Sequence, residues 1–361
     1  MNIAHDPVAA STRRRRRVGV FLAVLGVALL LTIVVAAGYG AVAIPPERVV
    51  AILAGWLGFA SASETGDTDS IVLLAIRLPR VCLGLLAGAA LAVAGAALQG
   101  LFRNPLADPG LIGVSSGAAV AAAAAIVLGG SAVAFLPAGS LTYLIPVAAF
   151  AGGLIITFVV YRIASRDGRT EVATLLLAGI ALNAISGAGI GLLIFLSDDQ
   201  QLRDLNFWLL GSLGGVTWER LLPAAPLMLV PTILLAMLWR HLNAFLLGET
   251  EALHLGFDVE RTKRWIVVLA ALAAGSSVAL TGIIGFVGLV VPHLIRLVIG
   301  PDHRSLLPAS VLLGAILLLL ADLLARTIVL PAELPIGILT SLIGGPFFLW
   351  LLVRRRGMGM W

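Results

Sequence analysis

The sequence has one lysine, one cysteine and few histidines, and each shortage excludes a class of chemistry. The lysine, Lys263, stands between Thr262 and Arg264, whereas a nucleotide-binding P-loop needs a glycine before its lysine and a serine or threonine after it. The single cysteine, Cys82, allows neither an intrachain disulfide nor a thiolate cluster. The 5 histidines are scattered, with no i, i+4 pair beside a glutamate, so no metal site is expected. The chain is not expected to be an enzyme or to hydrolyse a nucleotide through a P-loop.

Charge is also scarce, because the chain is strongly apolar. Only 12% of its 361 residues are charged and 60% are hydrophobic, with a mean hydropathy of +1.06. A soluble domain has about 25% charged and about 45–50% apolar residues. This composition excludes a water-soluble enzyme and indicates an all-α integral membrane protein, in which each span needs about 20 mainly apolar residues.

Ten apolar stretches are predicted to be membrane helices. The first follows the run Arg13 to Arg17 and is longer than the apolar region of a signal peptide, about 7–15 residues, so we interpret it as a retained helix. Residues 1–17 and 354–361 are predicted to be cytoplasmic tails on one permease domain, 18–353. The ten stretches are 18–43, 81–98, 111–128, 144–163, 172–196, 221–239, 265–283, 286–299, 308–329 and 336–353.

The basic residues predict the orientation, because cytoplasmic loops are rich in arginine and lysine. With both termini inside, all but six of the 24 basic residues fall in cytoplasmic segments. The net charge of +5 is therefore a topology signal and not a nucleic-acid footprint, and the arginine run is expected to meet anionic membrane lipid. The six exceptions are Arg48, Arg77, Arg80, Arg203, Arg220 and Arg326.

A weak internal repeat divides the spans into halves, 18–213 and 219–353. Gly95 lies ten residues before Pro105, and Gly282 lies ten before Pro292. Five helices in each half would make the second half run inverted, which is a transporter architecture with the path between the halves. Two alanine-rich segments can also resemble each other by chance.

Several segments are not explained by lipid contact alone. Arg77-Leu-Pro-Arg80 can snorkel to headgroups or bind an acidic partner surface. Asp322 and Arg326 are four residues apart and can pair on one helix face. Asp198, Asp199, Arg203 and Asp204 are predicted to form a polar outer loop before residues 206–213.

Two more of these segments lie between predicted spans. Pro105 and Pro109 require a chain turn within 99–113, which either lines a water-filled cavity or forms a packed hairpin. The longest cytoplasmic segment, 240–264, contains a short amphipathic helix over 246–256 that ends at a glycine. Its polar face is acidic, so a protein partner is favoured over a lipid surface.

At these residues the sequence resembles the FecCD family of permeases, the membrane subunits of type II ATP-binding-cassette (ABC) importers for cobalamin, iron siderophores and haem. The resemblance implies a ten-helix permease with two inverted halves, working as a homodimer in the bacterial inner membrane. Two ATPase subunits would bind ATP and Mg²⁺, so no cofactor is expected in this chain, and a periplasmic binding protein would deliver the solute. The motifs that carry the match include RLPR at 77–80, RNPLADP at 103–109, LLLAG at 175–179, GFVG at 285–288 and ELPIG at 333–337.

The resemblance also implies roles for particular positions. The binding protein would dock on Arg77, Arg80 and Arg326. The residues that couple to the ATPase would be Leu247, Gly248, Glu249, Ala252 and Gly256. The cytoplasmic gate would be formed by Asn104, Leu106 and Thr174, the last at the end of the loop 169–174.

The solute is expected to be haem, because residues 197–208 and 110–117 look closest to haem permeases. Arg203 would then bind a haem propionate, since guanidinium matches carboxylate in a bidentate way. It can equally pair with Asp204 or dock the binding protein. A ferric-siderophore or cobalamin importer is the alternative. An ion-coupled secondary transporter would need carboxylates inside the spans, where only Asp322 stands out.

Overall fold

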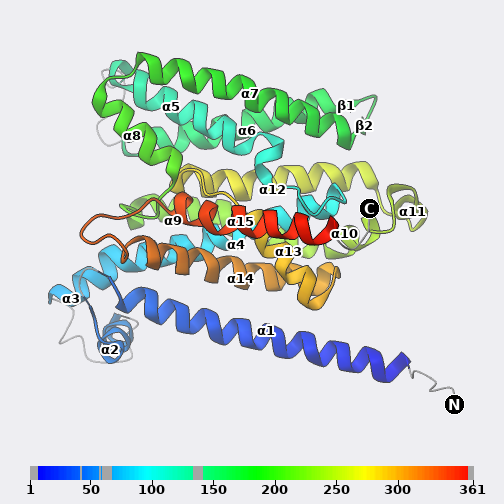
Figure 1. Cartoon of the computed structure of the whole chain (residues 1–361), viewed down its shortest axis with the longest axis horizontal. Coiled ribbons are helices and arrows are strands. Elements are labelled where there is room, and N and C mark those ends of the chain that lie inside the picture. The colour runs from blue at the N-terminus through cyan, green and yellow to red at the C-terminus, as the bar shows by residue number, and fades with distance from the viewer. Residues whose placement is uncertain (1–6, 41–42, 57, 59–66, 133–140, 357–361) are drawn as a thin grey trace.

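The chain folds into a bundle of long helices, which the computed structural model describes over residues 7–40, 43–56, 58, 67–132 and 141–356. Figure 1 shows most helices running along one common direction, with short elements gathered at the two ends. The first half of the chain forms α1 (Pro7–Gly38), α2 (Pro46–Trp56), α3 (Thr68–Ile71), the π-helix η1 (Val72–Arg77), α4 (Leu78–Leu101), the 3₁₀ helix η2 (Pro109–Ile112), α5 (Val114–Ala132), α6 (Leu141–Ala164), β1 (Ser165–Arg166), β2 (Arg169–Thr170), α7 (Val172–Leu196) and α8 (Asp199–Leu210). The second half forms α9 (Trp218–Met237), α10 (Trp239–Phe245), α11 (Glu249–His254), α12 (Val259–Thr281), α13 (Val287–Ile299), α14 (His303–Ala325) and α15 (Ile336–Arg356).

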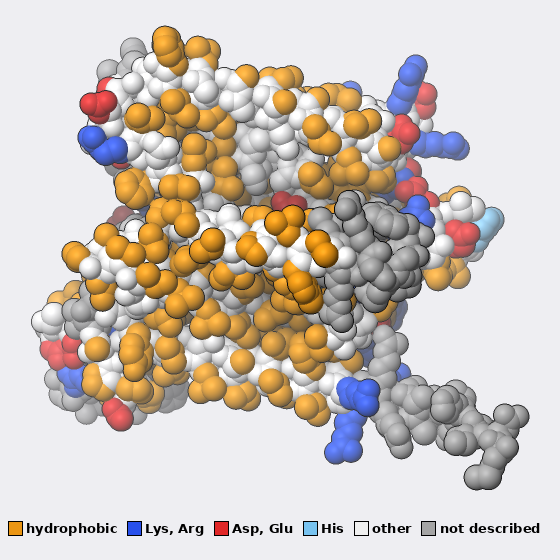
Figure 2. All heavy atoms as spheres, viewed as in Figure 1, with side chains coloured by type: hydrophobic (Ala, Val, Ile, Leu, Met, Phe, Trp, Pro, Cys, Tyr) orange, Lys and Arg blue, Asp and Glu red, His pale blue; other side chains and the backbone are white. Residues whose placement is uncertain are grey.

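Each of the ten predicted spans overlaps one of the longer helices, which confirms the all-α membrane fold. Among the described residues, 7 helices are long and apolar enough to cross a membrane, and α5, α13 and α15 are shorter apolar helices. Figure 2 shows hydrophobic side chains over the middle of the visible face and charged ones gathered toward its two ends. That distribution suits a hydrocarbon layer bounded by water.

Two boundaries differ from the prediction. α1 begins at Pro7, so the arginine run lies within this helix and not in a separate tail, in keeping with the high helix propensity of arginine. Residues 199–210 form α8, where a polar loop was expected. Asp198 and Gln201 form a reciprocal capping box that starts this helix, a local signal that the polar composition obscured.

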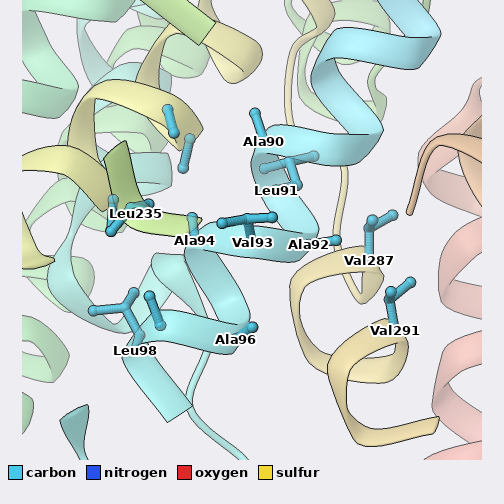
Figure 3. Packing of buried hydrophobic residues seen from close by; sticks show 14 of the residues in the cluster. Ala90, Leu91, Ala92, Val93, Ala94, Ala96, Leu98, Leu235, Val287 and Val291 are labelled. Atoms are coloured by element: carbon cyan, nitrogen blue, oxygen red, sulfur yellow. The ribbon is translucent and has the colours of Figure 1, made fainter. Parts of the chain in front are cut away.

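The centre of the bundle is α4, which is built mainly from alanine, glycine and leucine. Small side chains let neighbouring backbones approach closely, as membrane helices without a hydrophobic driving force require. Gly88 lies against Gly314 of α14, and Gly95 lies against Gly288 of α13. Figure 3 shows Leu235 of α9 on one side of α4 and two valines of α13 on the other.

The two ends of the bundle carry different elements. One end, here called the α3 end, has α2, α3 and the start of α8, and the opposite end, the α11 end, has α11 and the β1–β2 hairpin (Figure 1). The hairpin is antiparallel, with Ser165 opposite Thr170. α1 starts at the α11 end (Figure 1), as the predicted topology requires of a helix that begins in the cytoplasm.

Candidate functional sites at the two ends and in the middle

An arginine cluster lies at the α3 end, and it contains all three positions predicted to dock a partner. Arg77 ends η1, Arg80 is in the first turn of α4, and Arg326 follows α14. All three are buried, with 5%, 8% and 6% of their surfaces exposed. They therefore do not extend outward into the headgroups, as snorkelling side chains would.

Arg80 binds two carboxylates at once. Its Nε lies 2.9 and 3.1 Å from the two oxygens of Asp322, and its Nη atoms each lie 2.9 Å from an oxygen of Glu333. Asp322 is almost completely buried and also pairs with Arg326 at 3.4 Å, which confirms the predicted i, i+4 contact. Paired bidentate contacts of this kind are the strong form of the charged hydrogen bond.

The other two arginines cap the end of α1. Arg77 Nη1 donates to the carbonyl oxygens of Ala37 at 2.8 Å and Gly38 at 2.7 Å, and Arg326 donates to that of Ala36. The last carbonyls of a helix lack intrahelical partners and carry partial negative charge, so guanidinium groups stabilise them. Arginines on the outer side run against the positive-inside trend, and these contacts with the end of α1 provide an internal reason for them.

The cluster surrounds a cavity of about 240 Å³ lined by Arg77, Arg80, Arg326 and Glu333 among others. Three guanidinium groups meet the carboxylates of Asp322 and Glu333 there, and Asp69 also interacts electrostatically with Arg77. The Arg80 hydrogen bonds lower the pKa of Glu333 below its usual value, which keeps this carboxylate ionised.

The α11 end carries the segment predicted to couple to a partner. α11 is short and lies between Gly248 and Gly256. Both glycines have positive φ angles, 128° and 87°, a backbone conformation that favours glycine. Ala252 is buried against the bundle, whereas the four leucines predicted to form the apolar face of an amphipathic helix are exposed. The exposed side of this segment is mixed: Leu246, Leu247, Leu253 and Leu255 are exposed, and so are Thr250, Glu251 and His254.

The predicted gate positions do not all meet. Thr174 donates to Glu171 at 2.6 Å and shares with Glu249 a cavity of about 940 Å³ beside the hairpin. Asn104 and Leu106 lie outside the lining of that cavity. Asn104 instead shapes its own turn, because its side-chain oxygen accepts from the Leu106 backbone at 2.9 Å.

The break between α4 and α5 is packed by polar contacts in the middle of the bundle. Gln99 Nε2 points to the backbone oxygens of Ala107, Gly288 and Leu289 at 3.3 to 3.4 Å, and so joins the break to α13. Asn183 of α7 donates to Gly110 at 3.2 Å and accepts from Ser116 at 2.5 Å. Asn183 was not among the predicted site residues, although a single amide in the apolar stretch 172–196 is a signal for a functional position.

Arg203 lies apart from the arginine cluster, on the exposed side of α8. Its Nη2 donates to Gln200 at 2.8 Å. Asp204 accepts from the same Gln200, and no carboxylate among the described residues forms an ion pair with Arg203. Pairing with Asp204 therefore does not explain this arginine.

Comparison with known proteins places these features in a family context. The model of the FecCD transport family matches residues 28–354. The hemin transport system permease protein HmuU of Yersinia pestis is 52% identical over 83% of this chain and 89% of its own length. The cobalamin import system permease protein BtuC of Halobacterium salinarum is 46% identical over 80% of this chain and 75% of its own length.

A solved structure is similar as well. It is an ABC transporter described as of the metal-chelate type in an inward-facing conformation, with a TM-score of 0.78 and 33% identity. The match covers 92% of this chain and 98% of that one. The similarity therefore extends over the whole bundle described above.

Proposed function

The chain belongs to the FecCD transport family as a permease of ABC importers, and from this premise we propose that it carries haem as one half of a homodimer. The observation that carries the choice of haem is the 52% identity to a hemin permease over most of both chains. Arg203 supports it, because an exposed guanidinium at the α3 end, free of a carboxylate partner in the described chain, suits a propionate group.

Cobalamin is the second candidate solute. Cobalamin permeases are 46% identical in Halobacterium salinarum and 43% in Vibrio cholerae over comparable lengths. A ferric siderophore has no such relative among those compared above. Haem differs from both in its two propionates, and a propionate can pair with the Arg203 guanidinium.

An ion-coupled transporter is disfavoured because Asp322, the one acid that stood out in the predicted spans, is buried and paired. Asp322 is held by Arg80 and Arg326 and has 1% of its surface exposed. A carboxylate in two ion pairs is not available to bind a coupling ion from water. ATP hydrolysis by partner subunits is therefore the proposed energy source.

The second copy of the chain is expected to cover α7. Only 17% of its most apolar 18-residue window is buried, a smaller share than in any other candidate span of the described chain except α1, at 11%. α7 also lies at one edge of the bundle (Figure 1), so that a partner can reach it. The translocation path would then run between the two copies.

The two ends have separate proposed partners. The three arginines that line the cavity at the α3 end suit acidic residues of a periplasmic binding protein. The exposed leucines around α11 suit an apolar groove of the ATPase.

The proposed mechanism needs no covalent step in this chain. Closure of two ATPase subunits would displace α11 in each copy and shift the bundle between inward-facing and outward-facing states. The solute then moves because its path is exposed to opposite sides in turn. Specificity is expected to reside mainly in the binding protein.

Solute identity is tested by binding to the partner protein and by delivery. The binding protein is titrated with hemin, cyanocobalamin and a ferric siderophore, and its complex with each is added to the permease in nanodiscs with its ATPase. Haem as the solute predicts that hemin binds most tightly and is the one that stimulates ATP hydrolysis. Stimulation by cyanocobalamin alone would transfer the proposal to cobalamin.

A further inference from the structure

Lys263, the chain's single lysine, lies at the junction of three segments at the α11 end. It belongs to the second turn of α12, and only 3% of its surface is exposed. Its Nζ lies 2.7 Å from Glu249 Oε2, 3.1 Å from Glu260 Oε1 and 2.9 Å from the backbone oxygen of Thr170. An ammonium group has three protons to donate, and here each has an acceptor.

The three acceptors come from elements that are otherwise joined weakly. Glu249 is the first residue of α11, Glu260 is in the first turn of α12, and Thr170 ends the β1–β2 hairpin. Glu260 strengthens the hairpin contact, because its second oxygen accepts from the Thr170 backbone nitrogen at 2.8 Å. The Thr170 hydroxyl lies 3.2 Å from that of Tyr161, which extends the network to α6.

The hairpin leads directly into α7. Only Glu171 separates Thr170 from Val172, the first residue of that helix, and Thr174 lies in its first turn. A displacement of α11 that keeps the contact between Glu249 and Lys263 therefore reaches the start of α7 through a chain of charged hydrogen bonds. Burying an ammonium without its carboxylates is costly, so the contact is expected to persist during such a movement.

We propose that Lys263 is a positioning residue that transmits movement of the coupling helix α11 to the hairpin and the start of α7. This inference rests on the proposed function, because it assigns α11 as the element that the ATPase moves. Glu249 is then an internal link on the side of α11 that faces the bundle, while the leucines of the same segment face the ATPase.

The test measures movement of the β1–β2 hairpin directly, so its result does not depend on which solute is carried. Asp167 is exposed at the hairpin tip and is changed to cysteine in a Cys82→Ser background, then labelled with an environment-sensitive fluorophore. The full complex with its ATPase is placed in nanodiscs, and the fluorescence change on adding Mg-ATP with vanadate is recorded together with the ATPase rate. Lys263→Met and Glu249→Gln are compared with Arg261→Met, which removes an exposed charge from the same helix.

Transmission through Lys263 predicts that the hairpin response, measured relative to the ATPase rate of the same sample, falls about five- to tenfold in both network variants, as expected for a lost coupling free energy. The double variant should lose no more than Lys263→Met alone, because both changes break the same link. Arg261→Met should respond as the unchanged chain. Should Lys263→Met fail to assemble, Glu249→Gln alone decides, since it leaves Lys263 paired with Glu260.

A full hairpin response in Glu249→Gln, or additive losses in the double variant, would overturn the inference. The proposed function fails in a different way. In that case the unchanged complex itself would show neither a hairpin response to Mg-ATP nor stimulation by a loaded binding protein.

Discussion

Gly95 of α4 lies so close to α13 that a Cβ atom at position 95 would fall 1.9 Å from the carbonyl oxygen of Gly288. Backbone cannot move aside as a flexible side chain can, so this contact fixes the distance between the two helices. Gln99, one turn further along α4, donates to the same carbonyl group. Gly95 and Gln99 together hold the helix break of the first half against α13 of the second.

Gly95→Ala should therefore destabilise the fold by about 1–3 kcal/mol, because the methyl group forces α4 and α13 apart. Thermal unfolding in detergent measures this directly. Gly26→Ala is the matched control, since a Cβ there meets nothing within 4 Å. Equal melting temperatures for the two variants would contradict the close approach.

Asp322→Asn should be more damaging, because it leaves Arg80 and Arg326 without their buried carboxylate. Breaking a buried ion pair from one side costs about 3–5 kcal/mol, here reduced by the second partner of Arg80, Glu333. Chemical unfolding of the detergent-solubilised chain checks it. Asp67→Asn, which alters an exposed pair with Arg48, should change stability little, and a comparable loss there would remove the special role of Asp322.

The Arg80–Glu333 contact predicts a pH dependence of stability. The pKa of Glu333 lies below its usual 4.5, mainly because Arg80 donates hydrogen bonds to it. An acid with a lowered pKa stabilises the fold fully above its unfolded pKa, and the contribution is lost as pH falls through the folded value.

The melting temperature of the unchanged chain should therefore exceed that of Glu333→Gln by a constant amount from pH 7 down to about 5. The difference should shrink below about pH 4.5, where the unfolded carboxyl becomes protonated. Because the side chain is 46% exposed, screening keeps its contribution under about 1 kcal/mol. A gap that widened in acid would show that the carboxylate is strained and not stabilised.

Arg203→Gln should distinguish haem from a solute without carboxylates. Losing a charged hydrogen bond to a propionate weakens an interaction by about 1.5–3 kcal/mol, so the concentration of loaded binding protein at half-maximal hemin uptake should rise about ten- to a hundredfold. Arg48→Gln removes another basic residue from the same end and should leave uptake unchanged. If Arg203→Gln behaves like Arg48→Gln, Arg203 has no role in haem entry.

The features that could be predicted from the sequence are those that depend on residues close to one another in the chain. Ten apolar runs predicted the long helices because each run satisfies its own backbone in lipid. The pairing of Asp322 with Arg326 followed from helical spacing. The capping box at Asp198 and Gln201 is equally local, but the polar composition of this segment led to the prediction of a loop instead of the helix α8.

The most informative contacts could not be predicted because they join distant positions. Arg80 and Asp322 are 242 residues apart, and Lys263 and Thr170 are 93 apart. Nothing in either segment indicates its partner, since the pairing depends on how the helices pack. The family resemblance selected Arg77, Arg80 and Arg326 as a group, but only the structure shows that Arg80 already has two partners.

The central claim is ATP-driven haem import, and uptake into sealed vesicles tests it most directly. The complex of this chain with its ABC ATPase is reconstituted in liposomes that enclose Mg-ATP, and binding protein loaded with hemin is added outside. The account predicts hemin accumulation inside that requires hydrolysable ATP and stops when the ATPase is omitted. Accumulation driven by an ion gradient without any ATPase, or ATP-driven uptake of cyanocobalamin but not of hemin, would contradict it.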